Sequence, residues 1–445
     1  MSVRIMVTGR CGAADLDKID VSSDERTAEF PLLNAAGKWG FNIRQVTRQA
    51  LAHGIFPPTT AFDLLTLAIH VQMADLRISR ALWSTDGWTR EIRLVVPVVE
   101  PRRWHDRAPL LDRMLSFLTG DVWTVQFRQR PRVPPYTPRV TRTDEREFDG
   151  VCLYSGGLDS LVGVIDACAA GKRPLLASCG GTGGVGKPQQ AVFGELRRRF
   201  SALNLGRVTW GVRPPRLGDG PGAEPTTRGR SFSFFALAAF LASGMDGNTT
   251  IRVPENGLIA LNVPLDPLRI GAPSTRTTHP FYMRCWNDLL RGVGMTVTLE
   301  NPYAHKTKGE MVQRCSDQAA LTATLPLSMS CSSPSKARFT AGNPAQKHCG
   351  YCVPCLIRRG AVAAGFAAAD PTDYDQHDLS AIEDEPKGLQ VRAFRFACAT
   401  LPRSDFALRM HIQKSGPLGQ EGSSERKALA AMYARGVREV GAILP

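Results

Sequence analysis

The chain has 445 residues, a hydrophobic fraction of 43% and a formal net charge of +14. This length indicates two or three domains, and the composition is ordinary for a soluble globular protein. The longest apolar run of note, residues 232–242, is far short of the roughly 20 residues that cross a bilayer, and the first residues show no signal-peptide pattern. We therefore expect a cytoplasmic protein that does not enter the membrane.

The excess of positive charge favours anionic partners such as nucleotides, RNA or DNA. The arginines are spread along the whole chain, so a solvated arginine-rich surface explains this charge as well as a nucleic-acid patch does. Nucleic acid is therefore a partner that the charge allows but does not require. The 11 cysteines are an odd number, which argues against a disulfide framework.

Residues 1–148 are predicted to form an α+β accessory domain. Alternating apolar residues indicate strands near 1–10, 91–99 and 122–127, and apolar periodicity indicates helices at 60–74 and 108–118. The proline-rich stretch 130–139 predicts a linker, because proline donates no hydrogen bond to a sheet.

From residue 149 to residue 368, strand and helix patterns alternate. This order predicts an α/β domain with a doubly wound parallel sheet, in which ligands bind at the carboxyl ends of the strands. Residues 369–445 are predicted to be a helical C-terminal extension that ends in a helix at 424–440. The expected strands of the sheet are 151–154, 174–178, 207–212 and 250–253, and the expected helices are 158–170, 189–200 and 231–242.

The turn after the first of these strands carries the most informative motif. Its glycines let the backbone approach a ligand, and the following helix directs free N–H groups at phosphate. The serines add hydroxyl donors, and the acid suits Mg²⁺. The Walker pattern is missing, and a serine-capped glycine turn without a ligand is the plainer alternative. The motif consists of Ser155, Gly156, Gly157, Leu158, Asp159 and Ser160.

A second glycine-rich stretch, residues 179–187, follows the second predicted strand. It ends in Gly-Lys but lacks the spacing of a phosphate-binding loop. We interpret it as a loop over the site, either a lid or an ordinary surface loop.

Four cysteines have the spacing of metal ligands. Cys349, Cys352 and Cys355 form a double Cys-x-x-Cys, and Cys331 lies 17 intervening residues upstream. Four thiolates close a tetrahedral Zn²⁺ site and leave no position open for water, so we expect a structural zinc ion. An iron–sulfur cluster or a redox pair are the alternatives. The adjacent His348 could compete as a ligand, although a solvated histidine is the simpler interpretation.

The two motifs, with Lys308 and Glu310 between them, resemble the 7-cyano-7-deazaguanine synthase (QueC) family of PP-loop enzymes. The resemblance covers about residues 150–360. It implies an ATP pyrophosphatase fold in which ATP activates the carboxylate of 7-carboxy-7-deazaguanine, and ammonia then forms the amide. The segments 254–257 and 268–280 look like those of QueC-like proteins in bacterial anti-phage operons, among them the Qat system. In such proteins the activated carboxylate is expected to join an amine on a partner protein encoded in the same operon.

Other polar residues are candidate ligands of the nucleotide or the acyl group. Arg228 and Arg230 precede a predicted helix and could hold phosphate or the substrate carboxylate. Arg276 and His279 lie in a proline-flanked loop and could bind the acyl-adenylate. Lys308 could neutralise negative charge that builds up on phosphate in the transition state. A surface ion pair is the alternative for each.

Glu255 and Asn256 could bind the edge of a purine-like ring, since an acid and an amide pair with ring N–H and exocyclic groups; a polar turn is the alternative. We assign catalytic roles to Asp159, Arg276 and Lys308. Nucleotide binding is assigned to the Ser155–Ser160 loop and Arg230.

The motifs and the family resemblance together imply an ATP-dependent carbon–nitrogen ligase that uses Mg²⁺ and carries structural zinc. Its substrate is expected to be a 7-deazaguanine carboxylate, transferred to ammonia or to an amine of a partner protein, in anti-phage defence. A PP-loop enzyme that modifies tRNA is one alternative, and a nucleotide-sensing subunit without catalysis is another.

Overall fold

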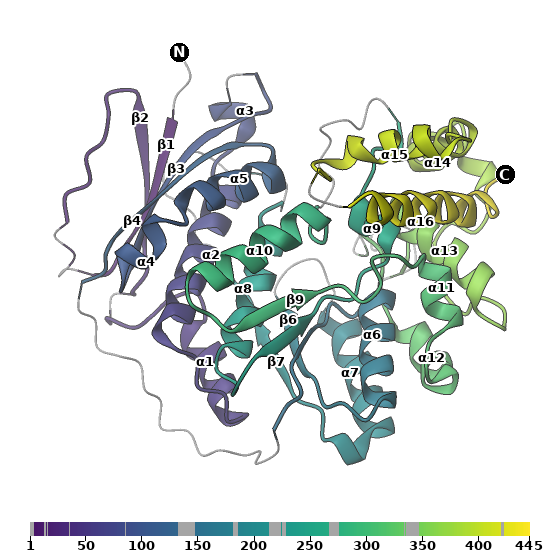
Figure 1. The fold of residues 1–445 in the computed structure, drawn as a ribbon, viewed down its shortest axis with the longest axis horizontal. Coiled ribbons are helices and arrows are strands. Elements are labelled where there is room, and N and C mark those ends of the chain that lie inside the picture. Colours follow the sequence, from purple (N-terminus) through teal and green to yellow (C-terminus); the bar gives the residue numbers. More distant parts are fainter. Residues whose placement is uncertain are drawn as a thin grey trace.

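Two parallel β-sheets organise the chain, with helices packed on them and a helical C-terminal region beside the second sheet (Figure 1). The computed structural model describes residues 4–12, 15, 17–34, 36–84, 86–131, 147–180, 186–212, 224, 228–266, 276–332, 334, 347–419 and 422–445. The predicted proline-rich linker lies largely outside this described part. None of the helices in these ranges is long and apolar enough to span a membrane.

The first sheet has the strand order β2-β1-β3-β4, and all three strand pairings are parallel. The prediction of an α+β N-terminal part is therefore wrong, and this part is α/β. A parallel pair needs a crossover connection, which α4 and α5 supply between β3 and β4. The elements are β1 (Arg4–Arg10), β2 (Glu25–Pro31), α1 (Ile43–Ala52), α2 (Thr59–Arg77), α3 (Arg80–Trp83), β3 (Glu91–Val98), α4 (Pro101–His105), α5 (Ala108–Thr119) and β4 (Val122–Gln129).

The second sheet confirms the predicted parallel α/β arrangement. Its strand order is β7-β6-β5-β8-β9, so the chain order reverses between β5 and β8. Helices α6 and α7 pack in one hydrophobic core, and helices α8 and α10 pack in another. The two pairs of helices together cover both faces of the sheet. The elements are β5 (Val151–Leu153), α6 (Leu158–Ala169), β6 (Leu175–Cys179), α7 (Gly186–Arg199), β7 (Arg207–Trp210), α8 (Arg230–Ala242), β8 (Thr249–Arg252), α9 (Gly257–Leu261), α10 (Pro280–Gly292) and β9 (Val297–Glu300).

The two sheets share one hydrophobic core, because α2 of the N-terminal part packs along α8. The rings of Phe62 and Phe240 meet edge to face with centroids 5.1 Å apart. Asp75, at the end of α2, accepts a hydrogen bond from the Gly229 N–H at 2.8 Å. The N-terminal part therefore holds the start of α8, which borders the site described below.

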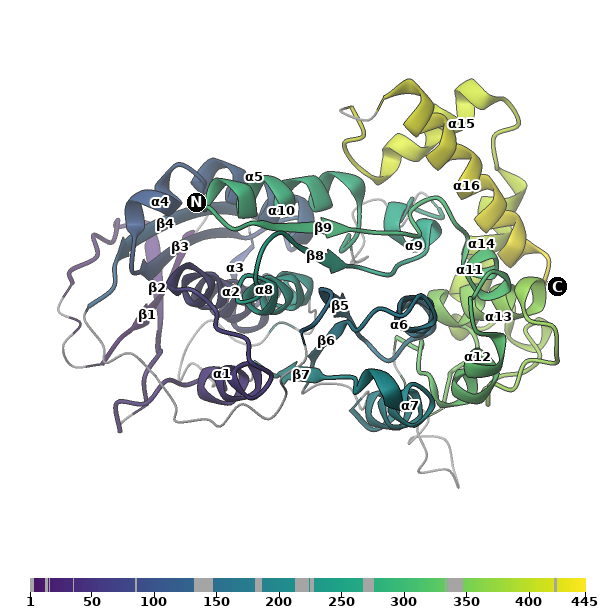
Figure 2. The same ribbon diagram turned by 60° about the horizontal axis from the view of Figure 1, so that its bottom comes forward.

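The C-terminal helices form a further core that includes α9 from the second part of the chain. Figure 2 shows α16 running past α9, α11 and α13. The predicted last helix is present as α16, within one residue at each end. These elements are α11 (Lys308–Gln313), α12 (Gln318–Thr324), α13 (Val353–Gly365), α14 (Leu389–Ala399), α15 (Asp405–Ile412) and α16 (Ser423–Gly441).

Candidate functional site

The Ser-Gly-Gly-Leu-Asp-Ser loop leaves the carboxyl end of β5, beside the point where the strand order reverses. Crevices at such reversals are where open parallel sheets bind ligands. Gly156 has a φ of +80°, and a Cβ there would lie 2.7 Å from Cγ of Gln189. Both the conformation and the space therefore require glycine.

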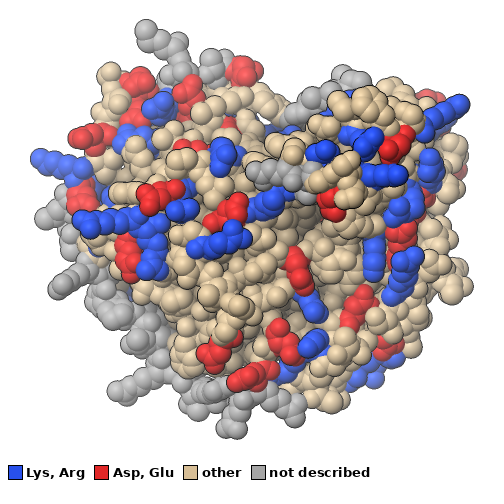
Figure 3. Space-filling view, viewed as in Figure 1, with Lys and Arg blue, Asp and Glu red and all other residues tan. Residues whose placement is uncertain are grey.

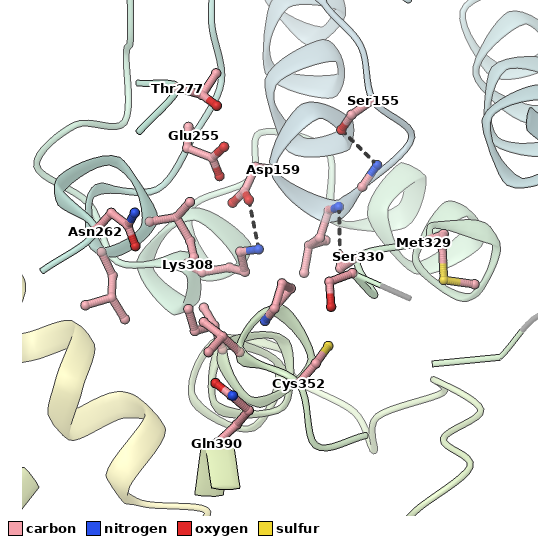
Figure 4. Close-up of a pocket in the computed structure, with 18 of the residues that line it drawn as sticks. Ser155, Asp159, Glu255, Asn262, Thr277, Lys308, Met329, Ser330, Cys352 and Gln390 are labelled. Carbon is pink, nitrogen blue, oxygen red and sulfur yellow. Dashed lines mark hydrogen bonds and ion pairs between the residues drawn. The ribbon is translucent and has the colours of Figure 1, made fainter. Parts of the chain in front are cut away.

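Hydroxyl groups organise the loop. The Oγ atoms of Ser155 and Ser160 lie 3.1 Å apart, and the Gly157 N–H donates to Ser155 Oγ at 3.3 Å. Ser330, which the sequence did not single out, accepts from the Leu158 N–H at 3.3 Å (Figure 4). The first N–H groups of α6 thus point at polar oxygens, which is the arrangement an anion would complete.

The loop opens into a cavity of about 980 Å³. Its walls come from both sides of the strand-order reversal, from the cysteine region and from the C-terminal extension (Figure 4). Its lining combines polar and apolar residues. The glycine-serine loop contributes Ser155, Gly157, Leu158 and Asp159, further charged side chains are Arg230, Glu255 and Lys308, and the apolar side chains include Leu258, Val263, Ile357, Leu389 and Phe394.

Asp159 and Lys308 form an ion pair in this cavity, with Asp159 Oδ2 2.8 Å from Lys308 Nζ. Asn256 Nδ2 donates to both Asp159 oxygens at 3.3 Å. Asn256 is fully buried, and its Oδ1 caps α9 by accepting from the Ile259 N–H. Its polar atoms are therefore engaged within the protein, which leaves Glu255 as the member of that pair that lines the cavity.

Glu255 points toward Asp159 (Figure 4). Burial raises the pKa of Glu255 well above its usual range, the negative charge of Asp159 raises it further, and Lys308 opposes the shift. Two carboxyl groups thus face one ammonium group, and a bound cation would favour the ionised form of both.

Lys308 is the first residue of α11, and a capping box fixes the start of this helix. Thr307 Oγ1 accepts from the Glu310 N–H, and the Glu310 carboxylate accepts from the Thr307 N–H at 3.0 Å. Glu310, part of the family resemblance, therefore caps the helix and also pairs with Arg435 at 2.7 Å. The buried, adjacent Lys308 is directed into the cavity.

The predicted arginine and histidine ligands separate into two groups. Arg230 and Arg228 line the cavity, although Arg228 also donates to the Thr119 carbonyl. Arg276 instead donates to the Phe117 carbonyl at 3.0 Å, and it is not among the described residues that line the cavity. The contacts of Arg276 give no support to a catalytic role.

His279 caps α10 and is fully buried. Its Nδ1 accepts from the Phe281 N–H at 3.2 Å, and its Nε2 lies 3.0 Å from Ser415 Oγ. Burial, together with the positive charges of the nearby Arg276 and Arg284, lowers the pKa of His279 to about 3. These contacts describe a neutral structural histidine.

The second glycine-rich stretch is described only at its ends. Cys179 ends β6 and lines the cavity, and Gly186 begins α7. Residues 181–185 lie outside the described part, so the choice between a lid and a surface loop stays a prediction.

The four predicted metal ligands come together. All four Sγ atoms lie within 4.8 Å of one another, and the Cys331–Cys352 and Cys349–Cys355 sulfurs are each 3.9 Å apart. Four sulfurs about 2.3 Å from one zinc ion would lie about 3.8 Å apart. Backbone N–H groups of Cys349 and Cys352 donate to neighbouring sulfurs, which favours thiolates. The cluster could hold a single metal ion such as zinc, and the sulfurs are too close together to enclose several iron atoms.

His348 is buried rather than solvated, and it is not a member of the sulfur cluster. Its Nε2 accepts from the Ser330 N–H at 3.1 Å. The Met329 N–H in turn donates to the Gly156 carbonyl at 2.9 Å. The segment next to Cys331 therefore connects the cysteine cluster to the glycine-serine loop. In the sequence, only the position of Ser330 beside Cys331 suggests this connection.

Basic and acidic side chains are interspersed over the face of the molecule in Figure 3. Among the described residues of this face, no broad surface of positive charge alone is visible. Comparisons of the chain with protein-family models, curated proteins and solved structures found no match.

Proposed function

We propose that the protein is a QueC-like PP-loop enzyme that uses ATP and Mg²⁺ to adenylate a 7-deazaguanine carboxylate and transfers the acyl group to an amine. The amine is ammonia or an amino group of a partner protein, as in the defence proteins that the chain resembles. A structural zinc ion in the cysteine cluster completes the proposal.

One observation carries this proposal. The glycine-serine loop lies at the strand-order reversal and opens into a cavity that also contains Asp159 and Lys308. Anion-binding N–H groups, a carboxylate for Mg²⁺ and a buried ammonium group are together what transfer of an adenylyl group requires. The roughly 980 Å³ volume supports the presence of a second substrate beside the nucleotide.

In the proposed first step, a carboxylate oxygen of the substrate attacks the α-phosphorus of ATP. The bond from this phosphorus to the bridging oxygen breaks, and pyrophosphate leaves with the electron pair. The loop N–H groups and the hydroxyls of Ser155 and Ser160 would hold the pyrophosphate. Lys308 and Arg230 would balance the negative charge that develops. The amine then attacks the acyl carbon, the bond from this carbon to the AMP oxygen breaks with its electron pair on AMP, and the nitrogen loses a proton to solvent to give the amide.

The proposal is tested by incubating the purified protein with ATP, Mg²⁺ and 7-carboxy-7-deazaguanine and measuring AMP and pyrophosphate. We expect release of both that depends on the carboxylate. Release that requires tRNA and ignores the deazaguanine would support the tRNA-modifying alternative. Binding of ATP without release under either condition would support a nucleotide sensor.

Asp159→Ala separates the site from the rest of the fold. We expect loss of AMP and pyrophosphate release with a retained circular dichroism spectrum, because the carboxylate lies in the cavity rather than in a core. The matched control is Asp288→Ala, which removes an exposed carboxylate of α10 that pairs with Arg291. Full turnover by the Asp159→Ala protein would refute the assignment of the site.

A further inference from the structure

The C-terminal helix α16 contacts α9 and α11, two of the helices that contribute residues to the cavity. Its Glu439 carboxylate accepts hydrogen bonds from the Gly309 N–H at 2.9 Å and from the Thr307 hydroxyl. These two donors flank Lys308 in the chain. One carboxylate from the C-terminal extension thus holds the backbone on both sides of the lysine that pairs with Asp159.

Glycine residues allow this close approach. A Cβ on Gly309 would collide with the Glu439 carboxylate, and a Cβ on Gly257, at the start of α9, would collide with the Met432 side chain. Within α16, Gly436 packs against Leu258. Helix α16 therefore lies against the starts of α9 and α11 at contact distances that larger residues would prevent.

A second contact makes the same connection. Arg435, one turn before Glu439 on α16, pairs with Glu310 at 2.7 Å and donates to the His305 carbonyl at 3.0 Å. Glu439 and Arg435 thus contact the segment around Lys308 from the same helix. The negative charge of Glu439 meets an N–H group at the start of α11, and the positive charge of Arg435 meets the acidic Glu310 in the same helical turn.

We infer that Glu439 is a positioning residue for Lys308, and that α16 therefore belongs to the catalytic apparatus rather than to an independent accessory region. The inference rests on the proposed function, because it takes Lys308 as the group that balances charge in the transition state. Glu439 does not line the cavity and acts only through the backbone it holds. A displacement of about 1 Å at a reacting group commonly lowers the rate about 10²-fold.

The test is a double-mutant cycle on the rate of AMP formation from ATP and 7-carboxy-7-deazaguanine. In the wild-type background, we expect Glu439→Ala to lower kcat about 30- to 100-fold, with KM for ATP changed less than threefold. In a Lys308→Met background, the same change should lower kcat less than twofold, because the residue it positions is gone.

Three further variants make the result specific. Glu439→Gln keeps one acceptor for Gly309 and an amide that can donate to Thr307, so we expect kcat within about fivefold of wild type. Glu439→Asp shortens the side chain by one methylene and serves if the alanine variant does not fold; we expect an intermediate kcat. Glu425→Gln is the matched control on the same helix, since it removes an exposed pair with His305, and its kcat should be unchanged.

Equal losses from Glu439→Ala in both backgrounds, or a loss of the same size in Glu425→Gln, would overturn the positioning role and leave the proposed function intact. A wild-type protein that releases no AMP with this substrate would remove the proposed function and this inference together.

Discussion

Replacing Lys308 should show how much its ion pair with Asp159 contributes to the free energy of unfolding. The side chains are 4% and 12% exposed, and the ionic atoms are 2.8 Å apart. At this distance the Coulomb energy is about 1.5 kcal/mol in water and about 6 kcal/mol at an effective dielectric constant near 20. Desolvation of both ions offsets part of this attraction. We therefore expect a coupling energy of about 2–4 kcal/mol.

The measurement is urea unfolding of the wild type, Lys308→Met, Asp159→Asn and the double variant. We expect Lys308→Met to be the more destabilising single change, by about 3 kcal/mol, because it leaves the largely buried Asp159 carboxylate beside the Glu255 carboxyl group with no ammonium partner. Asp159→Asn should be milder, since Glu255 can still balance Lys308. The double variant should recover most of the loss. A coupling below about 0.5 kcal/mol, or a milder Lys308→Met, would refute this account of the site.

Three further predictions concern the loop, the cysteine cluster and pH. Gly156→Ala should lose about 1–2 kcal/mol of stability and most ATP affinity in a calorimetric titration, whereas Gly171→Ala, also at positive φ but with open space around it, should lose only stability. Cys355→Ser should lower zinc measured by mass spectrometry from about one ion per chain to well below half, with Cys398→Ser as the unaffected control; unchanged zinc in the first variant would contradict the cluster. The pKa of His279 in the folded protein, about 3, is below its usual value, so the stability that the neutral imidazole contributes is present above pH 6.5 and is lost as the pH falls. His279→Asn keeps a capping acceptor but does not titrate, so its free energy of unfolding should depend less steeply on pH between pH 6.5 and 5. An identical dependence in the wild type and the variant would refute the buried neutral state.

The second sheet could be predicted from the sequence because its signals are local. Strands such as 151–154 are short apolar runs buried on both faces, and amphipathic or apolar helices separate them. The strand β9 was missed, since Val297–Glu300 alternates over only four residues. The parallel N-terminal sheet was misassigned as α+β, although a strand–helix–strand order was visible at 91–127, because pairing direction is set by the crossover and not by any residue within a strand.

In the candidate site too, local sequence patterns predict some residues correctly, and contacts between distant residues decide the others. For residues close together in the chain, such as Ser155–Ser160 and Cys349–Cys355, the sequence spacing itself limits how their side chains can lie relative to one another. The structure brings the four cysteines together. The prediction for Arg276 and His279 rests on residue type and on their place in a proline-flanked loop. Their partners, Phe117 and Ser415, lie far away in the chain, and no local pattern reports such contacts.

The sequence by itself determined a glycine-serine loop between a strand and a helix, and a four-cysteine cluster with metal spacing. Only the tertiary structure decided that Lys308 pairs with Asp159, that Asn256 caps the start of α9, and that Glu439 of the last helix accepts a hydrogen bond at the start of α11. The physical reason is that a turn or a Cys-x-x-Cys is built from neighbouring residues. A buried ion pair or a helix contact depends on which distant elements the hydrophobic core packs side by side.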